Sequence, residues 1–487
     1  MLGVAAAGCG EAPAEAIRFG LASAPVTLDP RFATDATSAR VNRLLYERLV
    51  DFDKRYRPVP ALADWTRVSP AHYRFTLREA DRRFHDGTRL TAADVQATYR
   101  SVLDPETGSP HRGTLDLIER VAIDEPDTVH FYLTEPDPLF PGYLVLGILP
   151  AEGVGAGHDF QRAPVGSGPF ELEAWPEEGR LRLVRRGDGQ VFEFLRVSDP
   201  TVRVLKLLRG EIDMLQNDLP PELVAYLEGR EEIRVVRAPG SNFTYLGFNL
   251  RDGVTGELAV RRAIAHALDR EAIIEHVMGG LARPAHALLP PSHWAGAPEL
   301  TGYDHDPAHA RELLARAGYP PGRRPKVTYK TSSDPFRVRL ATIIQRQLEE
   351  VGIEVGIRSY DWGTFYGDIK AGRFQMYSLA WVGIKTPDIF RYVFHSEAVP
   401  PKGANRGHFS SAAADRLIEA AGRAGDLETR ARYYRALQVL LLERLPYVPL
   451  WYENHVYVTR RGLRGYHIAR DGNYDGLMDV ERVTAAR

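Results

Sequence analysis

The chain contains little of several features that would narrow its function at once. Cys9 is its single cysteine, which excludes a framework of internal disulfides and the paired-cysteine motifs of redox and zinc sites. The formal net charge is only −2, so no strong electrostatic field favours nucleic acid as a partner. No run of 18 apolar residues occurs, and therefore no segment of the sequence as written is expected to span a membrane.

Motifs of catalysis and of cofactor binding are also missing. No nucleophile elbow, HExxH pair or supported Ser/His/Asp set occurs. Val165–Phe170 is rich in glycine and proline, but no Lys-Ser or Lys-Thr follows it as in a phosphate-binding loop. His305 and His309 have the spacing of a helical metal pair, yet Asp306 starts a helix between them, so the spacing loses its meaning. We therefore expect no catalytic residue, no cofactor and no metal site.

Length and composition predict a globular chain of several domains. At 487 residues, a typical size of about 150 residues per domain gives roughly three domains. Hydrophobic residues make up 44% of the chain, which is ordinary for proteins whose domains each bury a core. No period of about 20 to 50 residues recurs, so a solenoid is not expected.

The segment 325–381 carries the clearest local pattern. Residues 326–331 and 353–360 alternate as strands, and Asp334 followed by Pro335 supplies a helix N-cap with proline at the first helical position. Apolar residues at helical spacing follow. A strand, a helix and a strand in this order form a βαβ unit, so the two strands should be parallel.

A second helix at 362–371 and a strand at 374–381 extend this unit and bring in two indoles. Trp362 follows one strand end, and Trp381 closes the next strand. In open α/β sheets, ligands bind beyond the carboxyl ends of parallel strands, so both indoles are expected to face one crevice from neighbouring strand ends. There they would stack on a ligand or hold a cation. The alternative is that both pack in the core or at its rim.

The remaining sequence fits the same α/β class. Strands are expected at 17–21, 73–77 and 128–133, and helices at 38–49, 199–215 and 306–317. Thr91, with Asp94 three residues later, forms a near capping box at the start of a further helix.

Several segments match one known family. The aromatic strand Asn242–Asn249 leads through a glycine-containing turn to an amphipathic helix that begins at Val260, and a second helix starts at Asp269. Together with Phe84–Val95 and Pro446–Glu453, they resemble the ABC-transporter solute-binding proteins that capture oligopeptides, dipeptides and nickel complexes outside the cell membrane, known as extracellular solute-binding protein family 5. The resemblance covers nearly the whole chain.

The resemblance implies an α/β fold of the two-lobed periplasmic-binding-protein kind (type II-like) with an additional inserted domain. The expected division is 1–15 for a lipoprotein signal remnant and tether, 16–50 with 152–249 and 449–487 for a discontinuous first-lobe domain, 51–151 for the inserted domain, and 250–448 for the second lobe. The chain would cross between the lobes near Tyr245 and again near Trp451, and these crossings suit a hinge. Tyr245, Trp451 and Tyr452 either add aromatic walls to the cleft or belong to the core.

As function, the resemblance implies the extracytoplasmic solute-binding component of an ABC importer and not an enzyme. A ligand would enter the open cleft, the lobes would close around it, and the closed form would dock on permease subunits in the membrane. The expected ligand is a peptide or peptide-like solute, and the protein is expected to be a monomer that binds no nucleic acid. A sugar, an opine-like compound or a metal chelate is the alternative ligand. A periplasmic hydrolase is the alternative from another class.

The resemblance also assigns binding residues. Peptide-binding members have tryptophan at positions matching Trp362 and Trp381, and an aspartate three residues after the second tryptophan pairs with the ligand ammonium. Here Ile384, preceded by Gly383, takes that position. A buried ammonium without a counter-ion costs several kcal/mol, so another acid would have to replace the missing one. Asp388 is the nearest candidate, and the alternative is that it caps the helix that follows it.

Cys9 ends the small-residue run Ala7-Gly8-Cys9, which resembles the bacterial lipobox. We therefore expect a lipid on Cys9 that anchors an extracytoplasmic protein to the membrane. The basic region and most of the apolar region of a leader do not precede it, so either translation starts further upstream or the leader was trimmed. The alternative is a free thiol in a disordered tail.

Overall fold

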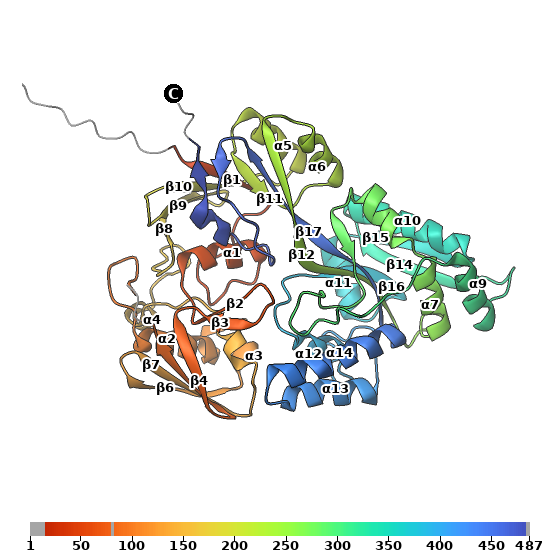
Figure 1. Ribbon diagram of the computed structural model, residues 1–487, viewed down its shortest axis with the longest axis horizontal. Coiled ribbons are helices and arrows are strands. Elements are labelled where there is room, and N and C mark those ends of the chain that lie inside the picture. The colour runs from red at the N-terminus through yellow and green to blue at the C-terminus, as the bar shows by residue number, and fades with distance from the viewer. Residues whose placement is uncertain (1–14, 79–81, 484–487) are drawn as a thin grey trace, which may run out of the picture.

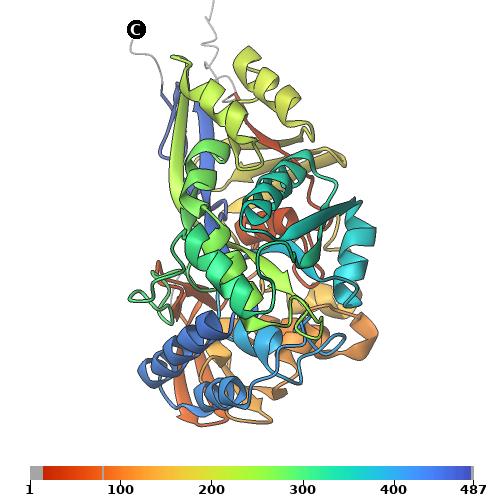
Figure 2. The same ribbon diagram turned by 90° about the vertical axis from the view of Figure 1, so that its right-hand side faces the viewer.

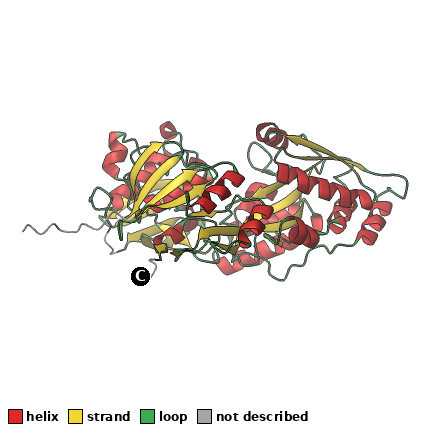
Figure 3. Cartoon of the chain, turned by 90° about the horizontal axis from the view of Figure 1, so that it is seen from above, coloured by secondary structure: helices red, strands yellow, loops and turns green. Residues whose placement is uncertain are grey.

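The computed structural model describes residues 15–78 and 82–483 of the chain. Its largest element is a mixed sheet of eleven strands that runs through two bodies lying side by side (Figures 1 and 3). In spatial order its strands are β15 (Glu354–Tyr360), β14 (Lys326–Ser332), β16 (Met376–Trp381), β12 (Ile233–Phe248), β17 (Tyr447–Arg460), β11 (Met214–Gln216), β1 (Ile17–Leu21), β10 (Val191–Arg196), β9 (Arg180–Arg185) and β8 (Phe170–Glu177), with β13 (Ala282–Pro284) paired to β17. The body that contains β1 is called the first lobe, and the body that contains β14 is called the second lobe.

Two long strands carry the chain from one lobe to the other. β12 and β17 pair antiparallel along most of their length, and their register shifts between Ala238 and Asn242. Gly240 lies within this shift. A Cβ at Gly240 would come within 2.3 Å of the backbone oxygen of Glu453 on β17. The two crossing strands therefore approach each other too closely there for any side chain.

The sheet of the first lobe is built around β1, which is parallel to both β10 and β11. Its helices are α1 (Ala36–Leu45), α5 (Pro200–Arg209) and α6 (Pro221–Glu228). The predicted strand at 17–21 is confirmed. The predicted helix at 199–215 is a few residues too long, because Gly210 adopts a φ of +75° and ends α5 at Arg209, and the chain then forms β11.

A smaller unit of the first lobe has a sheet of its own. It consists of the four-stranded sheet β4 (Ala63–Ser69), β5 (His72–Leu77), β7 (Thr128–Leu133) and β6 (Ile118–Glu125), the pair β2 (Val50–Phe52) and β3 (Pro58–Pro60), and the helices α2 (Ala92–Leu103), α3 (Arg112–Leu115) and α4 (Ala151–Ala156). Thr91 and Asp94 form the capping box of α2, in which the backbone N of Thr91 donates to Asp94 Oδ2 at 2.7 Å. The buried faces of β5 and β7 form a separate hydrophobic core with α2.

The second lobe confirms the predicted βαβ unit. β14 and β15 are parallel and joined by α10 (Pro335–Glu350), and Asp334 caps α10 by accepting from the backbone N of Arg337 at 2.9 Å. α11 (Trp362–Lys370) then leads to β16, which is also parallel to β14. One prediction needs correction. β14 lies between β15 and β16, so the two indoles do not stand at neighbouring strand ends.

The remaining helices cover the second lobe. They are α7 (Leu258–Ala267), α8 (Arg270–Ala272), α9 (Pro307–Arg316), α12 (Ile389–Phe394), α13 (Ala412–Arg423) and α14 (Leu427–Arg444), and the short pair β18 (Leu463–Arg464) and β19 (Glu481–Arg482) follows near the end of the chain. α7 packs against α9, and α13 packs against α14 (Figure 2). As predicted, Asp269 caps the helix after α7 by accepting from the backbone N of Ala272 at 2.9 Å.

The lobes also touch away from the crossing strands. Tyr56 and Leu139 of the first lobe are buried in a hydrophobic cluster whose other members belong largely to the second lobe. The ring of Tyr56 stacks on His293, with centroids 5.4 Å apart. Asp137 of the first lobe pairs with buried Arg430 of α14 at 3.3 Å. The lobes of this structure are therefore in contact beyond the two crossing strands.

Candidate functional site

The larger of two cavities between the lobes has a volume of about 700 Å³, which is within the usual range for small-ligand sites. Its walls include the carboxyl ends of β1, β11 and β16 and the middle of both crossing strands, at Leu21, Gln216, Val382, Asn242 and His455. Carboxyl ends of parallel strands are where open α/β sheets bind ligands. The sheet therefore places this cavity at the position expected for a binding site.

A smaller cavity of about 380 Å³ adjoins the larger one. Neighbouring residues mark the boundary, because Val382 lines the larger cavity and Gly383 the smaller one. Tyr474 and Asn473 are divided in the same way. The chain after β16 thus borders both cavities, and a ligand that follows it would reach from one to the other.

An ion pair joins the lobes beside this boundary. Lys385 Nζ of the second lobe lies 2.9 Å from Asp471 Oδ2 of the first, and its ammonium lies 5.7 Å from the ring centroid of Phe52. Burial alone would raise the pKa of the Asp471 carboxyl, but the charge and hydrogen bond of Lys385, the charge of Arg43 and the backbone N–H of Asn473 together outweigh it, and the pKa is lowered. This pair must part if the lobes separate.

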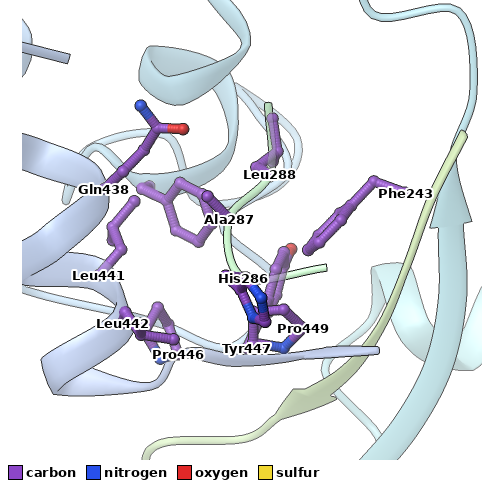
Figure 4. A pocket seen from close by; sticks show the side chains of 11 residues that line it. Phe243, His286, Ala287, Leu288, Gln438, Leu441, Leu442, Pro446, Tyr447 and Pro449 are labelled. Atoms are coloured by element: carbon purple, nitrogen blue, oxygen red, sulfur yellow. The ribbon is translucent and has the colours of Figure 1, made fainter. Parts of the chain in front are cut away.

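A third cavity lies inside the second lobe and has a volume of about 30 Å³. Phe243, Leu288, Leu441 and Tyr447 contribute to its mostly apolar wall (Figure 4). That volume is enough for about one or two water molecules. It is a packing void and not a place for a ligand.

The two predicted indoles belong to one aromatic row. Trp362 opens α11 with 59% of its surface exposed, and its ring stacks on Tyr366 at 5.4 Å. The guanidinium of Arg406 lies 5.2 Å from the ring centroid of Tyr366 and 5.1 Å from that of Trp381. Nε1 of Trp381 is buried without a hydrogen-bond partner in the described part of the chain. Trp362 of this row therefore offers exposed aromatic surface, and Trp381 offers a hydrogen-bond donor that the described residues leave unpaired.

Ile384 and Gly383 follow this row. Ile384 is buried in the core of the second lobe, with only 8% of its surface exposed. Gly383, at a φ of +72°, lines the smaller cavity. The apolar side chain at the position of the expected acid is therefore a packing residue, and the backbone beside it faces the cavity.

Asp388 stands at the N-cap position of α12, but its carboxylate makes no capping hydrogen bond. It reaches solvent, yet protein crowds it closely. The resulting desolvation raises the pKa of Asp388, and the negative charge of Asp137 across the lobes adds to the effect. Tyr143, which lines the smaller cavity, is near enough for the charge of Asp388 to raise its pKa further above the value that burial imposes. Within the described residues this carboxylate has no hydrogen bond or ion pair, and it lies near enough to Asp137 and Tyr143 of the first lobe to interact with them electrostatically.

Tyr245, Trp451 and Tyr452 are core residues and not walls of either cavity between the lobes. Each has no more than 2% of its surface exposed. The hydroxyl of Tyr452 donates to the backbone oxygen of Leu289 at 2.9 Å, and Tyr245 stacks on Tyr447 at 3.9 Å. They are buried because β12 and β17 are central strands covered by helices and loops, so the core alternative replaces the aromatic-wall alternative.

The larger cavity contains acids that the sequence analysis did not assign to a binding site. Asp35 and Asp334 accept hydrogen bonds from the first turns of α1 and α10, and Glu453 pairs with an arginine of α10 at 3.2 Å. Asp218 follows β11 and also lines this cavity. The rule that ligands meet strand ends would have pointed to Asp218, but a helix expected up to residue 215 concealed the end of β11.

Three further sequence predictions concern a lipid on Cys9, the lack of a membrane-spanning segment and the lack of a metal site. Cys9, the predicted lipid attachment point, lies outside the described residues. Within residues 15–78 and 82–483, no helix is both long and apolar enough to cross a membrane. In those same ranges no three His, Cys, Asp or Glu side chains gather as ligands for a metal ion would. His305 instead lies 3.5 Å from Asp269.

Two lobes, two crossing strands and cavities at the strand ends between them define the class of two-lobed ligand-binding proteins with the periplasmic-binding-protein architecture. The family within that class follows from sequence. The model for bacterial extracellular solute-binding proteins, family 5 (middle region), matches residues 57–399. The chain belongs to this family, whose members work outside the cytoplasm.

Three similar proteins cover nearly the whole chain. Protein XP55 from Streptomyces lividans is 31% identical over 92% of this chain and 85% of its own length. The periplasmic binding protein DppA from Helicobacter pylori, solved with the peptide STSA, has a TM-score of 0.77 and 26% identity over 96% of this chain and 98% of that chain. The binding protein AgaA from A. tumefacien R10, solved with agropinic acid, has a TM-score of 0.75 and 26% identity over 97% of this chain and 99% of that chain.

Proposed function

We propose that this protein is the extracytoplasmic solute-binding component of an ABC importer and that it binds peptides or peptide-like solutes between its lobes. The observation that carries the proposal is the 700 Å³ cavity at the carboxyl ends of strands from both lobes. The Helicobacter pylori protein bound to a peptide has the same architecture at 26% identity, which supports this ligand class. A non-peptide solute is the second candidate, supported by the similar protein that was solved with agropinic acid.

In this proposal the lobes close on the ligand by rotation about β12 and β17. Residues 16–50, 152–249 and 449–487 form the first-lobe domain, 51–151 its inserted domain, and 250–448 the second lobe. The closed form then docks on permease subunits in the membrane, and a lipid on Cys9 keeps the protein near them. Binding needs no reacting groups, because a closed state that holds one ligand better than another is sufficient for selection.

The ligand retained by freshly purified protein tests the ligand class. Native mass spectrometry is expected to detect bound species in the mass range of short peptides, and sequencing after release should identify them as peptides. Recovery of non-peptide solutes alone would favour the second candidate. Cleavage of added mixed peptides by the purified protein would instead contradict a binding role without catalysis.

We further propose that Trp362, Trp381 and the backbone at Gly383 contact the ligand and that Asp388 takes the part of the acid missing at Ile384. The carboxylate of Asp388 is not used by α12, and the chain between Gly383 and Asp388 borders the smaller cavity. A ligand running along this segment would bring its amino terminus towards Asp388. A charge-assisted hydrogen bond between ammonium and carboxylate is stronger than a neutral one.

Asp388→Asn is expected to weaken binding of peptides with free amino termini about tenfold, because the amide keeps the shape but loses the charge. Since the pKa of Asp388 is raised, the wild-type affinity for these peptides should also fall as the pH is lowered towards that pKa, and the variant should lack this dependence. Isothermal titration calorimetry over a pH series measures both effects. The same peptides with acetylated amino termini are the control, and an equal loss for them would contradict the assignment.

A further inference from the structure

Asp218 is held firmly on the wall of the larger cavity. Asn217 and Asp218 follow β11 with φ values of +61° and +56°. The side chain of Asn217 accepts from the backbone N of Val456 at 3.0 Å and contacts His455 Nδ1 at 3.1 Å. On the other side, the backbone oxygen of Asp218 accepts a hydrogen bond from Arg203. Both crossing strand and first-lobe helix therefore fix the turn that presents Asp218.

The carboxylate of Asp218 has no direct partner in the part of the chain that the structure describes. Among the described residues, no hydrogen bond and no ion pair within 4.0 Å involves it. The guanidinium of Arg203 donates its hydrogen bonds to backbone oxygens, including that of Val197. The guanidinium of Arg40 lies over the ring of Tyr474, 5.5 Å from its centroid. Asp218 reaches solvent, yet desolvation by the protein around it raises the pKa of its carboxyl, although the charges of Arg203 and Arg40 oppose the rise. A cation brought by a ligand would pair with this carboxylate and offset its partial desolvation.

The other acids of this cavity are already engaged. Asp35 and Asp334 cap helices, with their carboxylate oxygens 2.8 Å and 2.9 Å from the backbone nitrogens that they accept from. Glu453 accepts from Thr244 at 3.1 Å as well as from Arg337 at 3.2 Å. Asp218 is therefore the acid of this wall that is best placed to meet a charge from outside.

Apolar side chains of the same cavity suit the stem of a long cationic group. Pro221, Met278, Leu281 and Phe336 line it together with Asp218. Lysine and arginine side chains carry their charge on such a stem, which gains by contact with apolar surface while the charged end pairs with a polar group. The wall thus combines the two features that a basic side chain uses.

We propose that Asp218 binds a basic side chain of the ligand, so that the preferred substrates are peptides or peptide-like solutes that carry an ammonium or guanidinium group. This inference rests on the proposed function, which places the ligand in this cavity and assigns its amino terminus to Asp388. Asp218 selects among such ligands by pairing with a second positive charge, separate from the amino terminus.

Two matched sets of tripeptides test the proposal. One set has lysine at each position of Ala-Ala-Ala in turn, and the other has norleucine, which keeps the stem and lacks the ammonium. The wild-type protein is expected to bind at least one lysine peptide about tenfold more tightly than its norleucine counterpart. Asp218→Asn should abolish this preference and leave the affinity for norleucine peptides within about twofold. Calorimetry measures the affinities for the lysine and the norleucine peptides. Asparagine tolerates a positive φ, so the variant is expected to fold, and thermal unfolding checks this.

Two controls separate the possible outcomes. Asp64→Asn removes the same charge from an exposed surface pair with Arg78 and should leave the preference intact. Acetylation of the peptide amino termini should preserve the preference if it arises from the side chain, and its disappearance would assign the effect to the terminus and overturn the proposal. A preference that survives in the Asp218→Asn variant would also overturn it. Peptides that bind without any preference would refute this inference alone, whereas no binding of any peptide would refute the proposed function too.

Discussion

Gly240→Val is expected to lower both the stability of the protein and its affinity for the ligand. A Cβ at this position would come within 2.3 Å of the backbone oxygen of Glu453 and 3.2 Å of Nε2 of His455. The strands β12 and β17 would have to separate where they cross between the lobes. Forcing extra atoms into a packed site typically costs about 1–3 kcal/mol and sometimes more. Because His455 lines the larger cavity, the displaced strand would also distort the binding wall.

Urea unfolding and peptide calorimetry measure the two losses for Gly240→Val. Gly356→Val is the matched control, because Gly356 also lies in a strand, β15, where a Cβ would meet nothing within 4 Å. That strand is at the edge of the sheet and far from the crossing in strand order. The control is expected to be close to the wild type in both measurements. Equal destabilisation by both substitutions would contradict the role given to the close approach at Gly240.

Trp451→Ala is expected to lower the free energy of unfolding by about 3–5 kcal/mol, which is the usual loss for a fully buried tryptophan. Trp451 has 1% of its surface exposed and packs in the core of the second lobe beside β12. The cavity left by the indole cannot be refilled easily, because the surrounding core is closely packed on both faces of the sheet. Urea unfolding measures the loss.

Trp362→Ala provides the comparison for Trp451→Ala. With 59% of its surface exposed, Trp362 should contribute less than about 0.5 kcal/mol to stability, but its removal should weaken ligand binding if the proposed contact is correct. The two tryptophans thus separate stability from binding. If Trp362→Ala were as unstable as Trp451→Ala and bound the ligand with unchanged affinity, Trp362 would be a core residue and not a ligand contact.

Local pattern predicted the second lobe well. Asp334 and Pro335 begin α10 as expected, and the strands on either side are parallel. Capping and hydrophobic spacing act over a few residues, so a single sequence contains what is needed. The order of β14, β15 and β16 was not accessible in this way, because it depends on how α11 crosses the sheet. For that reason the predicted placement of the two indoles at neighbouring strand ends was wrong.

The site was less predictable because burial depends on contacts between distant segments. Tyr245 and Trp451 are aromatic and would suit the wall of a binding cleft, yet the pairing of β12 with β17 places them in the core. The carboxylate of Asp388 lies in sequence where a helix cap is expected, but it makes no capping bond. Asp218 was missed altogether, because its exposure follows from the end of a three-residue strand that no periodicity indicates.

The paired crossing strands restrict how the two lobes can move. A ribbon of two hydrogen-bonded strands bends and twists readily, but sliding one strand along the other would break the ladder of backbone bonds between them. In the proposed closing motion the lobes would swing about the ribbon while their mutual alignment along it stays constant. Each enclosed ligand would then meet the same residues of one wall opposite the same residues of the other, so the pattern of contacts would be the same for every ligand.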